Sequence, residues 1–316
     1  MRWQLKCVVD NCKGVLPFQD KFRKLKRHLV PYRPSLTRAQ LVIEEGMMQV
    51  QWLREAAGSL QDKTVLEIGS GWEPLVPLLF ALCGVDRVYL ADSNYLLDSA
   101  SLHGTLEIIR LSKERIVEKL KIDPQQFDRK FASDSSSVGE FIERFRFTYL
   151  APCDCQRLTF GGSVLDFVIS RAVFEHIPPE IIDGILAETR RILKPGGLIC
   201  HFIDNSDHWE HSDKTISRIN FLRFSDRTFR WTHLNRLDYQ NRLRHVEYAK
   251  MIKKHGFETV RDERIIDAGL IAALPALPLA PRFREFSAED MVTTDSRFLA
   301  RKVVDHQAQQ VLAFEN

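Results

Sequence analysis

The sequence predicts an α/β fold built on a mostly parallel, doubly wound, seven-stranded sheet that ends in an antiparallel hairpin. From Lys63 onward, apolar runs of strand length alternate with helix-length segments, the pattern of parallel strands joined by crossover helices. The first of these runs ends in a glycine turn, as strands do where a ligand approaches a sheet edge. The last two runs, residues 257–266 and 295–303, are separated by a proline-rich connection and are expected to pair as the hairpin.

Residues 1–60 are predicted to form a helical N-terminal extension. In residues 21–33, basic side chains interleave with apolar ones three and four apart, so a helix there has one apolar and one basic face. Such a helix suits peripheral contact with a membrane surface, and it equally suits packing on the main domain with its charges in solvent. A second helix is expected over residues 37–57.

Residues 61–204 are predicted to form the ligand-binding core. Pro74 suits the first turn of the helix that follows the glycine turn. Residues 95–147 are expected to be mostly helical, with a polar break at 133–137, and a helix over 179–193 leads into a Lys-Pro-Gly-Gly turn at 194–197. The five expected strands are TVLEIGS, RVYLAD, FTYLAP, LDFVIS and LICHFI.

Residues 205–245 interrupt the alternation of strands and helices, and we predict that they form a substrate lid inserted after the fifth strand. Arginines interleave there with aromatic residues, and arginine can bind carboxylate or phosphate bidentately. Arg223, Arg230 and Trp231 are the predicted acceptor-binding residues of the lid. An insertion whose aromatic residues pack on the domain and whose arginines are solvated explains the pattern equally well. Residues 246–316 are expected to complete the core sheet.

The composition narrows the class of protein. Of the 316 residues 44% are apolar, which is enough for a sizeable core, and the net charge of +3 argues against a protein that coats nucleic acid. Six cysteines form no CxxC pair and no zinc-ligand spacing, so reduced thiols and a cytoplasmic location are expected. The start of the chain shows no secretory signal, and the uncharged stretch 268–281 is too short and too rich in proline to span a bilayer.

The glycine turn after the first strand indicates a cofactor site. Glu67 lies at the end of the strand, and Gly69 and Gly71 let the backbone approach a ligand and take positive φ. A dinucleotide-binding turn needs a third glycine where this chain has Pro74, which excludes a pyrophosphate cradle. Asp92 ends the second strand, where an acidic residue can accept hydrogen bonds from both hydroxyls of a ribose.

With these features the sequence resembles the class I S-adenosylmethionine-dependent methyltransferases, and within them the small-molecule and glycan-type (type 11-like) members. The family's first motif matches at Glu67, Gly69 and Gly71, although Glu73 stands where a third glycine often lies. Further motifs follow in the family's order at residues 158–160, 166–170, 173–177 and 193–198, and the resemblance covers residues 60–204 and, more loosely, 245–303. It implies a Rossmann-like fold, S-adenosylmethionine as cofactor, and cofactor contacts from Glu67, Gly69, Ser70, Gly71, Asp92, Ser93, Asp154, Cys155 and Ser170.

The methyl acceptor is expected over the ends of the fourth and fifth strands. Arg171 and Asp204 are predicted to contact it, and the candidate general bases are His176, His208 and His211, because imidazole titrates near neutral pH. The histidine and carboxylate density over residues 204–213 would suit a divalent metal or a polar loop that caps a helix. Because the spacing matches no closed ligand set, no metal is predicted.

We therefore predict an S-adenosylmethionine-dependent enzyme that methylates an oxygen of a small metabolite or a sugar- or glycan-type acceptor bearing anionic groups. The Asn/Asp-Pro-Pro-aromatic tetrad of relatives that methylate base amino groups is absent at residues 170–173, so no stable nucleic-acid partner is expected. Two alternatives are a catalytically silent binding or regulatory protein of the same fold and an RNA methyltransferase that uses the arginine-rich lid.

Overall fold

The fold is described from a computed structural model, which describes residues 2–14, 35–135, 137–235 and 239–304. The basic segment 21–33, with its predicted membrane contact, lies outside these residues. Within the described ranges, every helix is either too short or too polar to span a bilayer.

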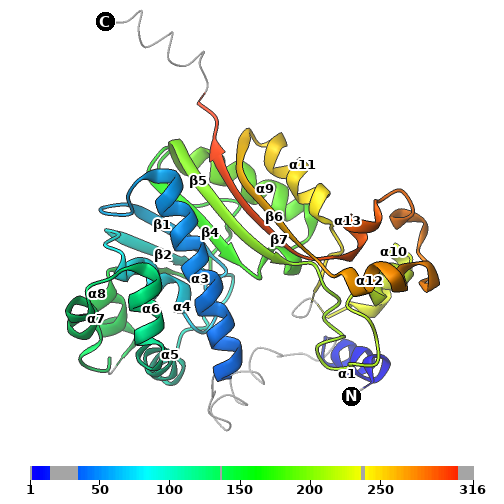
Figure 1. Cartoon of the computed structure of the whole chain (residues 1–316), viewed down its shortest axis with the longest axis horizontal. Helices are drawn as coiled ribbons and strands as arrows, with labels where there is room; N and C mark the ends of the chain where they lie inside the picture. The colour runs from blue at the N-terminus through cyan, green and yellow to red at the C-terminus, as the bar shows by residue number, and fades with distance from the viewer. Residues whose placement is uncertain (1, 15–34, 136, 236–238, 305–316) are drawn as a thin grey trace, which may run out of the picture.

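A single seven-stranded sheet organises the molecule, with the strand order β3-β2-β1-β4-β5-β7-β6 (Figure 1). Strands β1 to β5 pair in parallel, and β7 runs antiparallel to both β5 and β6. This arrangement confirms the predicted fold class, including the terminal hairpin. The strands are β1 Thr64–Ile68, β2 Arg87–Ala91, β3 Phe147–Leu150, β4 Leu165–Arg171, β5 Leu193–Asp204, β6 Phe257–Ile266 and β7 Thr293–Lys302.

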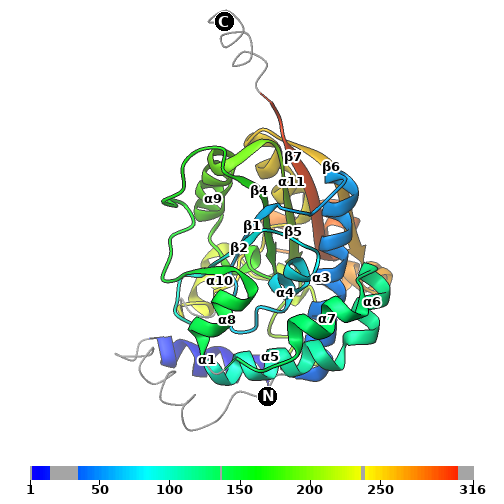
Figure 2. The same ribbon diagram turned by 90° about the vertical axis from the view of Figure 1, so that its left-hand side faces the viewer.

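Helices cover both faces of the sheet, as the two perpendicular views show (Figures 1 and 2). One face packs against α3 and α4, with α5 to α8 beside them, and the other face packs against α9 and α11. The α-helices are α1 Trp3–Gly14, α3 Leu36–Ala57, α4 Leu75–Leu82, α5 Ser99–Leu111, α6 Lys113–Leu120, α7 Pro124–Phe131, α8 Val138–Phe145, α9 Pro179–Ile192, α10 Asp226–Thr232, α11 His245–Lys254, α12 Ala268–Ala273 and α13 Ala288–Val292. Short 3₁₀ turns are η1 Phe174–His176, η2 Asn220–Arg223, η4 Leu274–Ala276 and η5 Pro281–Phe283.

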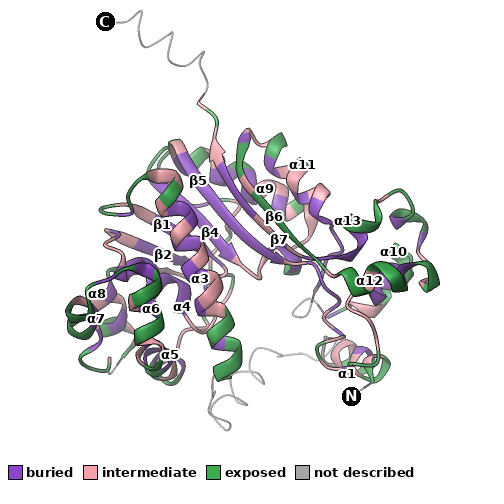
Figure 3. Cartoon of the chain, in the orientation of Figure 1, coloured by how far each residue is buried: buried purple, intermediate pink, exposed green. Residues whose placement is uncertain are grey.

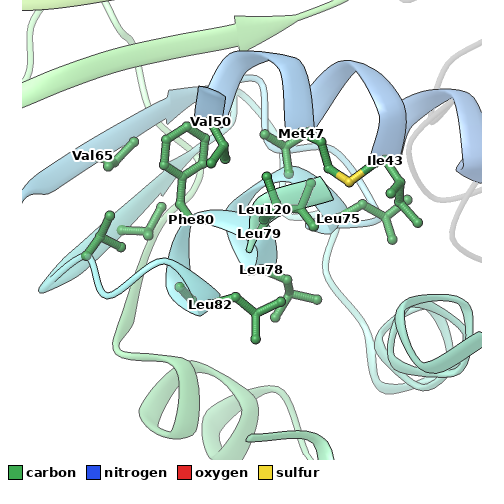
Figure 4. Close-up of a cluster of buried hydrophobic side chains, with 14 of the residues drawn as sticks. Ile43, Met47, Val50, Val65, Leu75, Leu78, Leu79, Phe80, Leu82 and Leu120 are labelled. Carbon is green, nitrogen blue, oxygen red and sulfur yellow. The ribbon is translucent and has the colours of Figure 1, made fainter. Parts of the chain in front are cut away.

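The largest core cluster lies between α3 and the sheet, with α4 in the middle. All eight residues of α4 are buried, because α3 covers the side of α4 that would otherwise meet solvent (Figures 3 and 4). Gly46 of α3 lets the two helices approach closely, since a Cβ there would lie 2.8 Å from Cδ1 of Leu79. An unbroken apolar run such as LVPLLFAL is therefore a helix buried on all sides, as its length and Pro74 predict.

The structure corrects the prediction of a turn at residues 194–197. This segment belongs to β5, which begins at Leu193. The pairing with β4 moves from Leu165 opposite Leu193 to Phe167 opposite Leu198, so β5 has extra residues between the two pairs. The extra residues form a bulge within β5, and β5 runs parallel to β4 both before and after the bulge.

The lid builds a small third core together with the segment 267–292. Its apolar residues pack on those of α12, η4, η5 and α13, away from the sheet. Within residues 246–316, β6 and β7 complete the sheet, whereas the segment between them belongs with the lid. The members of this cluster are Ile219, Phe221, Leu222, Phe229, Leu274, Ala280, Phe283, Met291 and Val292.

The N-terminal helix α1 docks on the lid, as both views show (Figures 1 and 2). The rings of Trp3 and Trp209 stack with their centroids 4.8 Å apart, and the backbone N–H of Trp3 donates to Asp213 at 2.8 Å. At the other end of the contact, the Asn11 amide donates to the carbonyl of Trp231 at 3.0 Å. The chain thus brings its first residues beside a segment that follows two hundred positions later.

Candidate functional site

The glycine turn after β1 is held against the neighbouring strand and loop. The backbone N–H groups of Gly69 and Ser70 donate to the carbonyl of Ala91 at 2.8 and 3.1 Å. Gly69 has φ +74°, and a Cβ at this position would lie 2.5 Å from Cγ2 of Val173. Glycine is therefore required here both for its conformation and for the space between the turn and the loop after β4.

Asp92 lies at the carboxyl end of β2 and faces this turn. One carboxylate oxygen accepts the N–H of Gly71 at 3.0 Å, and the other accepts the N–H of Asn94 at 2.9 Å. The side chain is only 8% exposed, so these bonds fix its orientation. Because each carboxylate oxygen can accept a further hydrogen bond, Asp92 suits the two hydroxyls of a ribose.

Glu67 lies one residue before the end of β1, and its carboxyl group is 6% exposed. Its Oε2 atom is buried without a hydrogen-bond partner in the described part of the chain. Burial, together with the nearby charge of Asp92, raises the pKa of Glu67 to about 8, and Arg171 opposes this shift. A buried carboxyl group with an unsatisfied oxygen fits the positively charged methionine end of S-adenosylmethionine.

Of the remaining predicted cofactor residues, one lies in the glycine turn and two are exposed in the loops after β2 and β3. Ser70 lies in the turn with its hydroxyl buried, and Ser93 is exposed beside Asn94, whose amide it accepts at 2.9 Å. Asp154, after β3, is exposed and accepts the N–H of Gln156 at 2.9 Å.

Cys155 and Ser170 are held by protein neighbours. Burial, together with Cys153, raises the pKa of the Cys155 thiol to about 12, so this group is neutral. The hydroxyl of Ser170 is 2.8 Å from Nδ1 of His201 on β5, and both residues are buried. Ser170 therefore contacts the neighbouring strand, on the same face of the sheet.

A cavity of about 530 Å³ lies where β4 and β5 end and β7 begins. This is the carboxyl edge of the parallel strands, where doubly wound sheets bind their ligands. Five of the predicted acceptor-site residues line it, namely Arg171, His176, Asp204, His208 and His211. Arg223, Arg230 and Trp231 are not among its lining residues; all three are exposed on η2 and α10, and their predicted contact with the acceptor stays a prediction.

Ion pairs order part of the cavity wall. Glu45 of α3 bridges two arginines, with Nε of Arg171 at 2.6 Å and a terminal nitrogen of Arg297 at 3.3 Å. Arg218 of the lid lies 3.6 Å from Asp295 of β7. Glu45, Arg297 and Asp295 were missed by the sequence reasoning, because they come from α3 and β7 and belong to none of the motifs.

Two histidines lie close to Asp204 at the end of β5, and a third lies beside one of them. One carboxylate oxygen of Asp204 lies 3.6 Å from Nε2 of His208 and 3.7 Å from Nε2 of His211. The ring of His208 stacks on that of His211 at 5.1 Å and lies 4.9 Å from that of His176. Burial alone would raise the pKa of Asp204, but the contacts with His208 and Ser206 outweigh it and hold this pKa below its usual range.

Two lid arginines are buried inside the protein, although the sequence predicted arginines that either bind the acceptor or are solvated. Arg244 is fully buried, and its guanidinium donates to backbone carbonyls of Asn205, Asp290, Met291 and Thr293. Arg242 is 4% exposed and donates to the carbonyls of Phe221 and Phe224 and to Asp226. These side chains hold the lid together and are neither solvated nor directed at a ligand.

The strand order defines a doubly wound α/β protein, and the turn between Glu67 and Pro74 lies at the topological switch between β1 and β4, where such sheets bind ligands. The pattern of a methyltransferase-domain family matches residues 44–262, more than half of the chain, and the chain therefore belongs to this family. This confirms the predicted class, the class I S-adenosylmethionine-dependent methyltransferases, and S-adenosylmethionine is the cofactor of that class. No curated protein matches the sequence significantly.

Several solved structures are similar to this chain at low sequence identity. The 1,6-didemethyltoxoflavin-N1-methyltransferase of Burkholderia thailandensis, with bound 1,6-didemethyltoxoflavin and S-adenosylhomocysteine, is 15% identical over 82% of this chain and 79% of its own, with a TM-score of 0.45. The [4+2]-cyclase SpnF is 14% identical over 82% of each chain, with a TM-score of 0.45. An S-adenosylmethionine-dependent methyltransferase from Mesorhizobium loti is 12% identical over 79% of this chain and 96% of its own, with a TM-score of 0.43.

Replacing Glu67 by glutamine is expected to stabilise the fold while weakening cofactor binding. With a pKa of about 8 in the folded state against 4.5 for the free group, Glu67 keeps a proton that the unfolded chain releases. Stability therefore falls as the pH rises from about 4.5 to 8. We expect Glu67→Gln to raise the free energy of unfolding by about 3–4 kcal/mol at pH 8 and to leave it nearly unchanged at pH 4.5, as measured by urea titration.

The same variant is expected to bind S-adenosylhomocysteine at least about tenfold more weakly, because the amide cannot neutralise the ammonium group. Glu44, whose side chain is 41% exposed and pairs with Arg115, provides the control. Glu44→Gln should change neither property by a measurable amount. A stability gain at pH 4.5 equal to that at pH 8 would contradict the assigned proton.

Proposed function

We propose that this protein transfers the methyl group of S-adenosylmethionine to a hydroxyl oxygen of an anionic small-molecule or glycan-type acceptor bound in the cavity. The observation that carries the proposal is Arg171, which lines the cavity and acts electrostatically on Glu67 in the cofactor turn. The acceptor cavity and the cofactor turn are therefore close enough for one charged residue to act on both. Bringing the acceptor and the activated methyl group together in line is the main contribution that a methyltransferase makes to its reaction.

The charges of the cavity favour an anionic acceptor. Arg171, Arg297 and Arg218 are paired with carboxylates of the protein. Arg38 and Lys6 also line the cavity, and within the described ranges neither has a carboxylate in ion-pair distance. A carboxylate or phosphate group on the acceptor would supply the missing partner, and guanidinium binds either group bidentately.

His211 is our choice of general base. Its side chain is 52% exposed, so a proton taken from the acceptor can pass on to solvent. The carboxylate of Asp204, 3.7 Å from Nε2, orients the ring and stabilises its charged form. In the step, His211 accepts the hydroxyl proton, the oxygen bonds to the methyl carbon, and the bond from that carbon to sulfur breaks, leaving a neutral thioether.

An acceptor screen with isotope-labelled S-adenosylmethionine tests this proposal. We expect methylation of hydroxylated carboxylates or phosphates and little or none of the matching esters and amides. With a hit in hand, Arg38→Ala should raise KM for the acceptor at least about tenfold and leave the Kd for S-adenosylhomocysteine unchanged.

Arg115 on the surface of α6 offers a matched control. Its Nε atom lies 2.7 Å from a carboxylate oxygen of Glu44, and neither residue lines the cavity. Arg115→Ala should leave both constants unchanged. Equal turnover of charged and neutral acceptors would overturn the charge argument. Cofactor binding without turnover of any acceptor would favour the catalytically silent alternative.

A further inference from the structure

Two segments far apart in the sequence place a carboxylate and two imidazoles together at the cavity. Glu175 and His176 lie in η1, directly after β4, and His208 lies in the first turn of the lid. One ligand atom from each of the three residues lies within 4.8 Å of the other two. All three residues line the same cavity.

The side-chain carboxyl group of Glu175 has no hydrogen-bond partner among the described residues. The residue is 2% exposed, and both of its carboxylate oxygens are buried without a hydrogen-bond partner there. The nearby Arg171 directs its Nε at Glu45, at 2.6 Å. A buried carboxyl group without hydrogen bonds is costly, and native proteins pair such groups or use them to coordinate a metal.

Each of the two imidazoles offers a ring nitrogen to the cluster, and a backbone bond orients that of His176. Nδ1 of His176 lies 2.9 Å from the carbonyl of Tyr239, so this nitrogen carries the hydrogen and Nε2 keeps its lone pair. Bonds of this kind fix the tautomer of metal-binding histidines in other proteins. Nε2 of His208 is buried without a hydrogen-bond partner in the described part of the chain, and Asp204 lies 3.6 Å from it.

We propose that Glu175, His176 and His208 bind one divalent first-row transition-metal ion, with zinc as the representative ion, and leave a fourth position open toward the cavity. Two imidazoles with a carboxylate favour such an ion over magnesium, which prefers oxygen ligands and water. Two ligands about 2.1 Å from one zinc ion are at most about 4.2 Å apart. The ligand atoms, which lie within 4.8 Å of one another, therefore have to move closer together on binding.

The site has a bearing on the reaction because it opens on the acceptor cavity. An acceptor oxygen that takes the open position on the ion loses its proton more easily, since a bound cation lowers the pKa of a coordinated hydroxyl. This role rests on the proposed function. The metal site itself does not, because it depends only on the three side chains of Glu175, His176 and His208.

The test is a metal titration of the full chain after removal of metals with a chelator. Isothermal titration with zinc chloride should show one saturable site per chain. Glu175→Gln and His208→Ala are each expected to weaken it about 100-fold. The matched control is His255→Ala. Nε2 of His255 lies 2.9 Å from the carboxylate of Asp183, and neither residue lines the cavity, so this variant also loses a histidine–aspartate pair but no proposed ligand. The control should bind zinc like the unmodified chain.

Several outcomes overturn the metal site. Absence of saturable binding, unchanged affinity in both ligand variants, or a preference for magnesium over zinc would each contradict it. Thermal unfolding of each variant shows whether a loss of zinc binding reflects a loss of fold, and Glu175→Gln keeps the shape of the buried group. The same preparations are titrated with S-adenosylhomocysteine, so a failure of the metal site is distinguishable from a failure of the cofactor site.

Discussion

Replacing Asp92 by alanine is expected to weaken the binding of S-adenosylhomocysteine at least about 100-fold. Each ribose hydroxyl loses a hydrogen bond to a charged acceptor worth about 1.5–3 kcal/mol, and a loss of about 2.8 kcal/mol in all is a factor of 100. The glycine turn also loses its anchor, because Asp92 accepts the N–H of Gly71. Isothermal titration calorimetry with the purified chain measures the effect.

Asp166 is a closely matched control for this experiment. It is 8% exposed, like Asp92, and lies in the same sheet, but near the amino end of β4. Its carboxylate accepts hydrogen bonds from Thr64 and Lys194, which outweigh burial and lower its pKa. We expect Asp166→Ala to reduce stability and to leave cofactor affinity unchanged. Similar losses of affinity in both variants would show that Asp92 acts only through the fold.

The second large effect is expected on stability, from replacing Arg244 by methionine. Arg244 donates to four backbone carbonyls that belong to three segments, the start of the lid, α13 and the start of β7. Methionine has a similar length but no donor, so these buried carbonyls lose their partner. Burial lowers the pKa of Arg244 to about 10, and relief of that cost offsets part of the loss. We expect a net loss of about 3 kcal/mol in the free energy of unfolding.

Urea unfolding of Arg244→Met and Arg230→Met checks this expectation. Arg230 is exposed on α10, so its replacement should change the free energy of unfolding by no more than about 0.5 kcal/mol. A loss below about 1 kcal/mol for Arg244→Met would show that the carbonyls find other donors. The comparison separates a buried lid arginine from a solvated one in the same segment.

The parts of the fold that the sequence predicted are those that depend on local patterns. Alternating apolar runs placed the strands, and the prolines and glycines placed the turn between Glu67 and Pro74. The class of cofactor followed from the resemblance of Glu67, Gly69 and Gly71 to the first motif of the class I S-adenosylmethionine-dependent methyltransferases, with Asp92 after the adjacent parallel strand. The placement of the strands and of the turn needs only these local patterns and the order of the elements.

The parts that the sequence could not predict depend on contacts between distant segments. Arg244 has the same local surroundings in the sequence as the exposed arginines of the lid, and only the convergence of three segments buries it. The docking of α1 through Trp3 and Trp209 likewise joins residues some two hundred positions apart. For the same reason, the spacing around His208 concealed its approach to Glu175, since the two residues come from separate loops.

The antiparallel direction of β7 also determines where a tag or label can be attached without obstructing the cavity. Because β7 begins at the cavity with Thr293 and ends at Lys302, its exit lies at the edge of the sheet opposite to the cavity (Figure 1). The first helix, in contrast, lies on the lid, and Lys6 lines the cavity itself. An affinity tag or fluorophore attached after β7 should therefore leave acceptor entry unhindered, whereas the same group fused before Trp3 would stand beside the entrance and compete with the acceptor for space.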